Sequence, residues 1–305
     1  MSKNLKRTGR AIGVVGAAAC TVIFVAHPSF PTPDKLMIFL IFLFAGFNQG
    51  WAMFKRIFPF VAVILVYESF RSVVPQLNSH VNYALAPRLD RFIFGSLPTA
   101  DLQKWWWHGQ VHWYDIVLYI PYLIFFVAPL ALAILIWKTR ERYYWRAVCA
   151  YSLLFFMSFV TFLLLPTAPP WLASSKHFIQ PITRISSNVW AAIGIGNFPS
   201  VYNHLSPNPV AAFPSLHSGA STLFSLIVFK LYGRRWGAIS LIYPILIYIG
   251  VVYEGEHYAS DVIAGIIYAL VAYFAAGYIL RACQRLAEIV KAYSSSTKTA
   301  LRSRQ

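Results

Sequence analysis

Two residues near the carboxyl end of the chain have the types and the spacing of a catalytic pair. In the stretch YEGEHYASDVIAG, Asp261 follows His257 by four residues. On a continuous helix the two side chains lie on one face, so the carboxylate can hold one ring nitrogen of the imidazole. The other nitrogen is then a base or a nucleophile, which is the arrangement that capture of a phosphoryl group by histidine requires. A satisfied polar pair that joins two helices is the alternative interpretation.

A second histidine stands at the expected start of a helix. In the stretch AAFPSLHSGAS, Pro214 precedes Ser215 and His217, and proline suits the first turn of a helix. Backbone amides at such a start attract anions, and the hydroxyl of Ser215 either binds the same anion or caps the helix. A protonated His217 beside a bound phosphate can give a proton to the departing oxygen. A purely structural histidine at a helix start is the alternative.

The elements that must position these residues are membrane helices. Of the 305 residues, 58% are hydrophobic and only 12% are charged. Several apolar runs are long enough to cross a bilayer, and only closed backbone hydrogen bonding is stable in lipid. We therefore expect an all-α polytopic membrane bundle of about eight transmembrane helices. The expected spans are residues 11–27, 36–54, 57–74, 113–137, 145–165, 216–232, 237–253 and 259–280.

The basic residues distinguish the two sides of the membrane. The net charge of +16 comes from short clusters between apolar runs, so membrane topology explains it and no nucleic-acid partner is expected. Nineteen of the 26 Lys and Arg residues fall on one side, which we assign to the cytoplasm together with both termini. The other side receives all eight histidines. The chemistry is therefore expected on the extracytoplasmic face.

The remaining segments carry weaker signals. Residues 75–112 mix aromatic and charged side chains, which is typical of short helices in the outer interface. The basic, serine-rich end of the chain is expected to be a loosely ordered tail. The first apolar run can also be a secretory signal peptide, although no small-x-small cleavage site follows it. The three cysteines lie in or at the end of apolar runs, which gives neither a disulfide framework nor the spacing of metal ligands.

The stretches PSLHSG and HYASD together resemble the second and third motifs of the type 2 phosphatidic acid phosphatase superfamily of membrane phosphatases and phosphotransferases. PTAPPW at 166–171 and LDRFIFG at 89–95 resemble its inositol phosphorylceramide synthase branch. The resemblance covers roughly residues 57–280 and implies a six-helix core and a two-step reaction without metal or cofactor. It implies that His257 forms a phosphohistidine, that Asp261 orients it and that His217 protonates the leaving group.

This resemblance suggests three divisions of the chain. Residues 1–56 form a basic N-terminal segment with two additional transmembrane helices, and residues 57–281 form the catalytic membrane domain. Residues 282–305 form the basic cytoplasmic tail.

The chain departs from the common phosphatase pattern where that pattern supplies cations. No K-x6-R-P match is found, and Gly250 and Val251 occupy the positions of a Ser-Arg pair. We therefore expect other phosphate ligands. Arg71, at the outer end of its span, is the first candidate, although an ion pair or snorkelling to the interface explains it equally well. Arg88 and Arg91 are second candidates. The alternative is that both are exposed residues of a surface helix with no contact to phosphate.

Residues next to the histidines offer further contacts to substrate. Glu254 and Glu256 precede His257 and could contact an acceptor head group, but solvation in an exposed loop is the simpler expectation. Trp171 in PTAPPW either closes the site or anchors a rigid turn.

These observations predict an integral membrane enzyme, expected in a bacterial cell membrane. It would move a phospho-group from a phospholipid or polyprenyl phosphate to a hydroxyl of inositol, a sugar or another lipid. With water as acceptor, the same site would make a lipid phosphate or polyprenyl (pyro)phosphate phosphatase. A lipid transporter whose histidines sense pH is a further alternative. It predicts charged residues in mid-span, whereas the strong candidates in this chain lie near helix ends.

Overall fold

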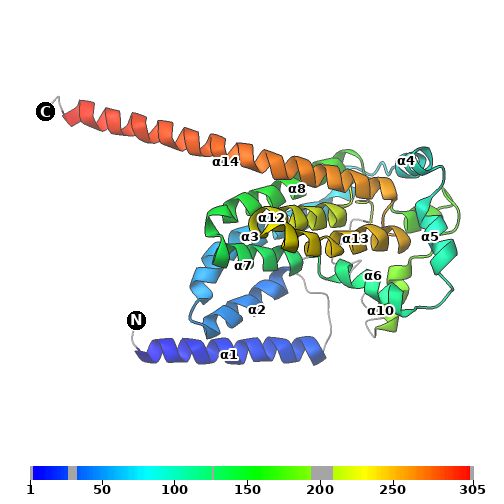
Figure 1. Cartoon of the computed structure of the whole chain (residues 1–305), viewed down its shortest axis with the longest axis horizontal. Helices are drawn as coiled ribbons and strands as arrows, with labels where there is room; N and C mark the ends of the chain where they lie inside the picture. Colours follow the sequence, from blue (N-terminus) through cyan, green and yellow to red (C-terminus); the bar gives the residue numbers. More distant parts are fainter. Residues whose placement is uncertain (1–2, 27–32, 126, 194–208, 303–305) are drawn as a thin grey trace.

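The computed structural model describes residues 3–26, 33–125, 127–193 and 209–302, and within these ranges the protein is an all-α bundle without β-strands (Figure 1). The expected fold class is confirmed. The helices are α1 (Lys3–Ala26), α2 (Pro33–Gly46), α3 (Gly50–Leu77), α4 (Leu85–Phe94), α5 (Pro98–Trp106), α6 (Trp113–Leu123), α7 (Val127–Thr139), the 3-10 helix Glu141–Tyr143, α8 (Tyr144–Leu164), α9 (Pro170–Ser175), α10 (Ile185–Ala192), α12 (Leu216–Ser240), α13 (Ile242–Tyr253) and α14 (Ala259–Arg302).

Several of these helices are long and apolar enough to cross a membrane. Within the described ranges, three single helices qualify, and up to five spans result if each of two bent pairs counts as one. The expected continuous span 113–137 is one of those pairs, since α6 and α7 meet at an angle of 52°. Pro129 lies in the first turn of α7 and has no amide to donate back to the carbonyl of Phe125, so the helix restarts there.

The second bent pair is a helical hairpin. Gly233 inside α12 has φ 87° and ψ 174°, a conformation that glycine adopts without a steric penalty. Beyond it the chain runs back along α12. The hydroxyl of Ser225 donates to the carbonyl of Ser240, and the hydroxyls of Thr222 and Tyr248 lie 2.6 Å apart. The expected helices 216–232 and 237–253 therefore pack side by side, and α13 ends close to the start of α12.

The core lies where α3, α8, α12 and α14 meet. Buried side chains from each helix fill it, among them Phe60, Tyr151, Leu223 and Ala272. At one end α12 and α14 approach so closely that a Cβ atom added to Gly265 would lie 2.2 Å from the carbonyl oxygen of Ser215. This close approach places the first turn of α14 against the first turn of α12.

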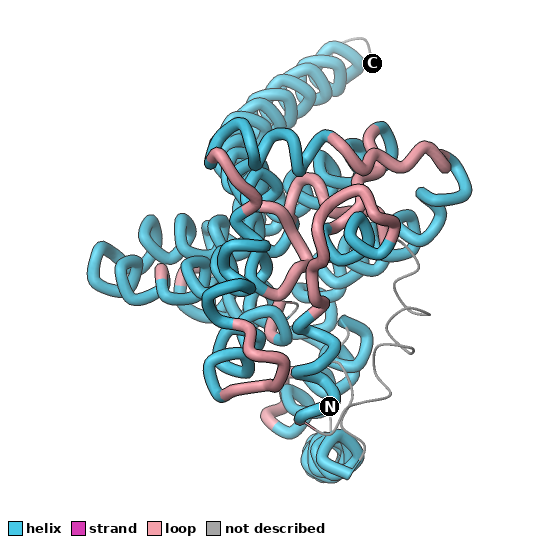
Figure 2. The backbone as a smooth tube through the Cα atoms, turned by 90° about the vertical axis from the view of Figure 1, so that its right-hand side faces the viewer, coloured by secondary structure: helices cyan, strands magenta, loops and turns pink. Residues whose placement is uncertain are grey.

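Short helices and loops cover that end of the bundle. α4, α5, α9 and α10 gather there, and the loops that join them cross one another in the end-on view (Figure 2). The centre of this cover is the PTAPPW segment, in which Thr167 forms parallel bridges with Asn82 on one side and Ala211 on the other. The expected short helices of the 75–112 segment are thus present as α4 and α5.

The two ends of the chain lie outside this core. α1 packs on α2, and α2 packs on α3. The expectation of a loosely ordered tail is wrong for the described part, because α14 continues as one helix to Arg302 and projects from the bundle (Figure 1). Residues 282–302 contain no proline or glycine, and their four alanines and five charged residues offset the serine- and threonine-rich run at 294–299.

Candidate active site

The two catalytic candidates come from different helix starts and meet at the covered end of the bundle. His217 is in the first turn of α12, and His257 lies in the turn between α13 and α14. The Nδ1 atom of His217 is 3.3 Å from the Nε2 atom of His257. The sequence therefore predicted correctly that these two residues, forty positions apart, lie together.

The surroundings of His257 determine which of its nitrogens is available. Its Nδ1 atom lies 3.0 Å from the carbonyl oxygen of Ala212 and 3.5 Å from Oδ2 of Asp261. Both neighbours are hydrogen-bond acceptors, so Nδ1 carries the proton and donates it. Nε2 then has the free lone pair, and it is the atom that faces His217. The site thus holds the tautomer that a nucleophilic imidazole needs.

Asp261 is held in turn by the start of α14. Its Oδ2 atom accepts a hydrogen bond of 2.8 Å from the amide of Tyr258, and its backbone carbonyl accepts one from the amide of Ser215. The side chain is fully buried. Oδ1 has no hydrogen-bond partner among the described residues. The second contact joins α14 directly to the start of α12, so the two histidines are fixed by one connected set of bonds.

The ring of His217 lies against two aromatic side chains that the sequence did not indicate. Tyr122 of α6 stacks on it with ring centroids 4.3 Å apart, and Phe125 lies at 4.6 Å. These rings restrict the imidazole to the orientation in which Nδ1 faces His257. The broken helix pair α6–α7 therefore supplies one wall of the site.

The carbonyl that accepts from His257 is itself positioned by the PTAPPW segment. The amide of Ala212 donates to the carbonyl of Thr167, and the amide of Thr167 donates to the carbonyl of Val210. Trp171 is half-buried at the end of the segment, and its amide donates to the carbonyl of Gly255. PTAPPW thus connects the strand-like segment before α12 to the turn that carries His257.

Asp90 is a supporting residue that the sequence analysis missed, although it lies within LDRFIFG. Its two carboxylate oxygens accept from the amides of Ala259 and Ser260, so it caps the start of α14. Burial raises the pKa of Asp90, and the hydrogen bonds from Ser260 and Ala259 act in the opposite direction. The signal that could have identified it is an acidic residue two positions from the apolar run FIF of the same short helix, although the two arginines of this helix make that signal weak.

Comparison with known proteins assigns this chain to a family. A family model described as the PAP2 superfamily matches residues 88–275, which is more than half of the chain. The chain belongs to the PAP2 superfamily. It is also 26% identical to the phosphoinositol dihydroceramide synthase of Bacteroides thetaiotaomicron over 246 residues, which cover 76% of this chain and 79% of that protein. No solved structure matches it significantly.

Members of this superfamily commonly have a Ser-Arg pair where this chain has Gly250 and Val251. The packing around these two residues explains why larger or charged side chains are absent there. A Cβ atom on Gly250 would lie 2.8 Å from the carbonyl oxygen of Leu118 in α6. Val251 is 1% exposed and belongs to an apolar cluster with Ile185 and Val189 of α10. An arginine in this position would be buried among apolar side chains, so position 251 is not suited to a cation.

The predicted phosphate ligands are placed as follows. Ser215 is fully buried and caps α12, with its hydroxyl accepting from the amide of Ser218. Arg88 and Arg91 are exposed on α4, and neither has an ion-pair partner in the described part of the chain. Arg71 lies on α3, but its side chain is outside the described residues. All four remain predicted ligands.

Arg91 influences the pKa of Tyr258, the residue that follows His257. Burial and the carboxylates of Asp261 and Asp90 raise the pKa of Tyr258, and the guanidinium of Arg91 lowers it. Tyr258 directly follows His257, so Arg91 lies within electrostatic reach of the turn that carries His257.

The two glutamates before His257 are not solvated, so that expectation is wrong. Glu256 accepts a hydrogen bond of 2.7 Å from Arg184 and one of 2.5 Å from the hydroxyl of Ser186. Glu254 is fully buried, and neither of its carboxyl oxygens has a hydrogen-bond partner among the described residues. Burial, followed by the charges of Glu256 and Asp115, raises the pKa of Glu254 well above its ordinary value.

Proposed function

We propose that the protein is a membrane phosphotransferase that carries a phospho-group from a lipid phosphate to a hydroxyl acceptor through a phosphohistidine on His257. The observation that supports this most strongly is the pairing of a lone pair on Nε2 of His257 with Nδ1 of His217, 3.3 Å away. One nitrogen is suited to attack phosphorus, and the other is suited to carry the proton of the leaving oxygen.

In the first step, Nε2 of His257 attacks phosphorus and forms a P–N bond. The P–O bond to the donor breaks, and the proton on Nδ1 of His217 passes to that oxygen. Asp261 and the carbonyl of Ala212 hold the other side of the His257 ring, so the positive charge that develops on the ring faces two acceptors. A phosphate that contacts both imidazoles must part them, because 3.3 Å leaves no room for a phosphorus atom between the nitrogens.

In the second step, the acceptor oxygen attacks phosphorus and the P–N bond breaks. The acceptor proton passes to Nδ1 of His217, which returns both histidines to their starting states. These steps need no metal ion, since the imidazoles supply both nucleophile and acid. Water in place of the acceptor would give hydrolysis by the same site.

The related synthase favours transfer over hydrolysis. Its name indicates a product in which phosphoinositol is joined to dihydroceramide. We propose the same class of reaction for this chain, with a phosphoinositol-bearing lipid as donor and a long-chain lipid alcohol as acceptor. The distribution of Lys and Arg supports the extracytoplasmic face of the membrane as the side of this reaction.

A polar surface beside the nucleophile is suited to a hydroxyl-rich head group. The guanidinium of Arg184 lies 4.3 Å from the ring of Trp171 and donates to Glu256, the residue before His257. The carboxylate of Glu256 holds the guanidinium in place, the guanidinium can donate to hydroxyls of a head group, and an aromatic ring packs against the face of an inositol or sugar ring. We assign the head group of the donor to this surface.

The test is a transfer assay with the purified full-length protein in detergent. Labelled phosphatidylinositol is supplied with and without dihydroceramide, and lipid and water-soluble products are separated. The expected result is a labelled phosphoinositol lipid that needs dihydroceramide, with no product from the His257→Ala variant. Water-soluble phosphoinositol or phosphate as the sole labelled product, with every acceptor tried, would overturn the transferase proposal.

A further inference from the structure

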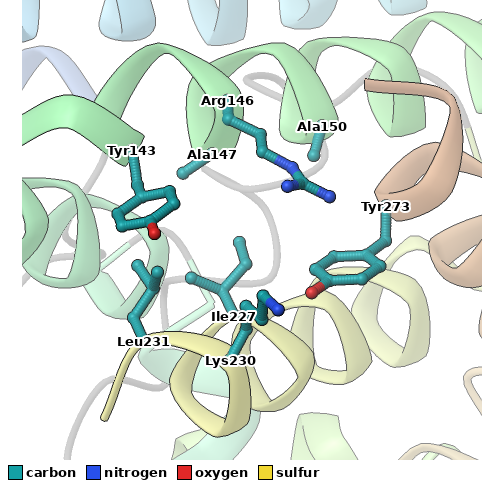
Figure 3. A pocket seen from close by; sticks show the side chains of 8 residues that line it. All are labelled: Tyr143, Arg146, Ala147, Ala150, Ile227, Lys230, Leu231 and Tyr273. Atoms are coloured by element: carbon teal, nitrogen blue, oxygen red, sulfur yellow. The ribbon is translucent and has the colours of Figure 1, made fainter. Parts of the chain in front are cut away.

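A pocket lies between α8, α12 and α14, away from the paired histidines (Figure 3). The pocket is a half-open hollow: about 320 Å³ of space lies among its lining residues and in front of them, and only about 20 Å³ of it is closed. Tyr273 lines it, and α14 rises about 18 Å between Asp261 and Tyr273. The pocket is therefore separate from the candidate active site.

Two cations from different helices line this pocket. Arg146 comes from α8 and Lys230 from α12, and Figure 3 shows the guanidinium, the ammonium and the hydroxyl of Tyr273 turned towards the same space. The guanidinium lies 5.5 Å from the ring of Tyr273. It also occupies the space beside Gly277, where an added Cβ atom would meet it at 2.9 Å. Arg146 is thus seated against α14 rather than extended into the surroundings.

Among the described residues, neither cation is neutralised by an acidic side chain. No carboxylate pairs with Arg146 or Lys230 in the described ranges, and Glu141, an acid at this end of the bundle, is paired with Arg56 instead. Two like charges that face one space repel each other, and the repulsion is stronger next to apolar walls than in water. The pocket therefore favours an anion that can contact both.

The rest of the lining indicates what kind of anion. Ala147 and Ala150 of α8 and Ile227 and Leu231 of α12 supply apolar lining on the two sides of the pocket (Figure 3). Arg146 and the two alanines belong to a helix segment that is apolar enough to span a membrane. A soluble anion gains nothing from such a lining, whereas a lipid brings a phosphate and an acyl chain together. Basic pockets between transmembrane helices are typical sites for anionic lipid head groups.

We propose that this pocket binds an anionic phospholipid as a structural ligand, with its phosphate between Arg146 and Lys230 and an acyl chain along the apolar lining. The lipid would hold together α8, α12 and α14, and the last two helices carry His217 and Asp261. This site is independent of the proposed reaction, since none of its residues contacts the paired histidines.

The experiment measures lipid binding to the delipidated protein in detergent. Phosphatidylglycerol, phosphatidylcholine and inorganic phosphate are titrated separately, with melting temperature and native mass spectrometry as readouts. The test variants are K230Q, in which the changed side chain is exposed, and R146Q/K230Q. The matched control is R234Q/R235Q, which removes two exposed charges after Gly233 without touching the pocket.

The expected result is stabilisation by phosphatidylglycerol that exceeds the effect of phosphatidylcholine. Its affinity should fall about tenfold in K230Q, since one charge-assisted contact is lost, and further in the double variant. R234Q/R235Q should bind like the unchanged protein. Equal binding of both lipids, equal loss in R234Q/R235Q, or unchanged affinity in K230Q would overturn the proposal. Inorganic phosphate that stabilises as strongly as the lipid would overturn the assignment to a phospholipid.

Discussion

The carboxylate of Asp90 accepts a hydrogen bond of 2.8 Å from the backbone amide of Ser260, although 170 positions separate the two residues. Ser260 lies in the first turn of α14, next to Asp261, which contacts His257. A buried acid on the short helix α4 thus fixes the start of the helix on which the catalytic candidate depends. α4 is therefore part of the support of the site as well as its cover.

Asp90→Ala should lower turnover by at least tenfold and destabilise the protein by about 1–2 kcal/mol, because two amides at the start of α14 lose their acceptor. Asp90→Asn keeps one acceptor oxygen and should be intermediate. Asp101→Ala is the control, because it removes a carboxylate from the first turn of α5 without touching α14. Turnover and thermal unfolding are measured for all three. Equal loss of turnover in Asp90→Ala and Asp101→Ala would show that Asp90 has no specific role in positioning.

Glu254→Gln should change how stability depends on pH. The folded protein holds the proton of Glu254 to a higher pH than the unfolded chain, whose pKa is about 4.5. Folding therefore takes up a proton, and the contribution of Glu254 to stability falls as pH rises above 4.5 towards the folded pKa. Glutamine is neutral in both states and lacks this dependence. The melting temperature of Glu254→Gln should rise relative to that of the unchanged protein between pH 5 and pH 8.

The control for this titration is Glu288→Gln, which changes an exposed carboxylate on α14. It should leave the pH dependence of the melting temperature unchanged. If the difference in melting temperature between Glu254→Gln and the unchanged protein stays constant from pH 5 to pH 8, the buried carboxyl of Glu254 is not protonated in the folded state.

Local patterns in the sequence predicted two histidines and an aspartate that the structure brings together, whereas the residues that were missed depend on long-range packing. His257 lies in the turn before α14, so the expectation that both residues share one continuous helix is wrong, although the spacing still brings Nδ1 of His257 within 3.5 Å of Oδ2 of Asp261. Asp90 acts on amides 170 positions away, and no local pattern records such a contact. Glu254 has the composition of a solvated loop residue, yet α10 packs over its turn through the hydrogen bond from Ile185 to the carbonyl of Glu254. Burial of this kind depends on tertiary structure.

The fold, too, was predicted where it depends on local sequence patterns and missed where it depends on packing. Hydropathy predicted the bundle and the hairpin of α12 and α13. It did not predict the break between α6 and α7, because a proline near a helix start and one inside a kinked helix look alike in sequence. That break matters for the site, since Tyr122 and Phe125 flank it and both contact His217.

The activities of His217→Ala and His257→Ala should depend differently on how good the leaving group is. A lipid alkoxide needs a proton as it departs, so His217→Ala should slow the first step with a lipid donor by about 10²–10⁴. A p-nitrophenyl phosphodiester has a leaving group that needs no acid, so the same variant should still release a burst of p-nitrophenol. His257→Ala should lose both reactions. Single-turnover release is the measurement.

The covalent species provides a second readout for this pair. His217→Ala treated with a labelled p-nitrophenyl phosphodiester should retain protein-bound label that is stable in alkali and released by acid. Label of equal amount on His257→Ala would place the nucleophile elsewhere. A burst of equal size from both variants would contradict the assignment of His257 as the attacking residue.

Val251→Arg tests why this chain lacks the cation that its family commonly places before the catalytic histidine. Val251 is 1% exposed, and its carbonyl accepts from the amides of Glu256 and His257. An arginine there would be buried among apolar side chains of α6 and α10, at a cost of several kcal/mol. We expect a poorly folded protein without turnover, whereas Val251→Met, which is apolar and similarly long, should stay folded. Size-exclusion profiles and turnover of both variants are compared. A folded Val251→Arg protein with a lower KM for the donor would mean that the helix can rotate to present position 251 to the phosphate, and that the apolar cluster does not exclude a cation.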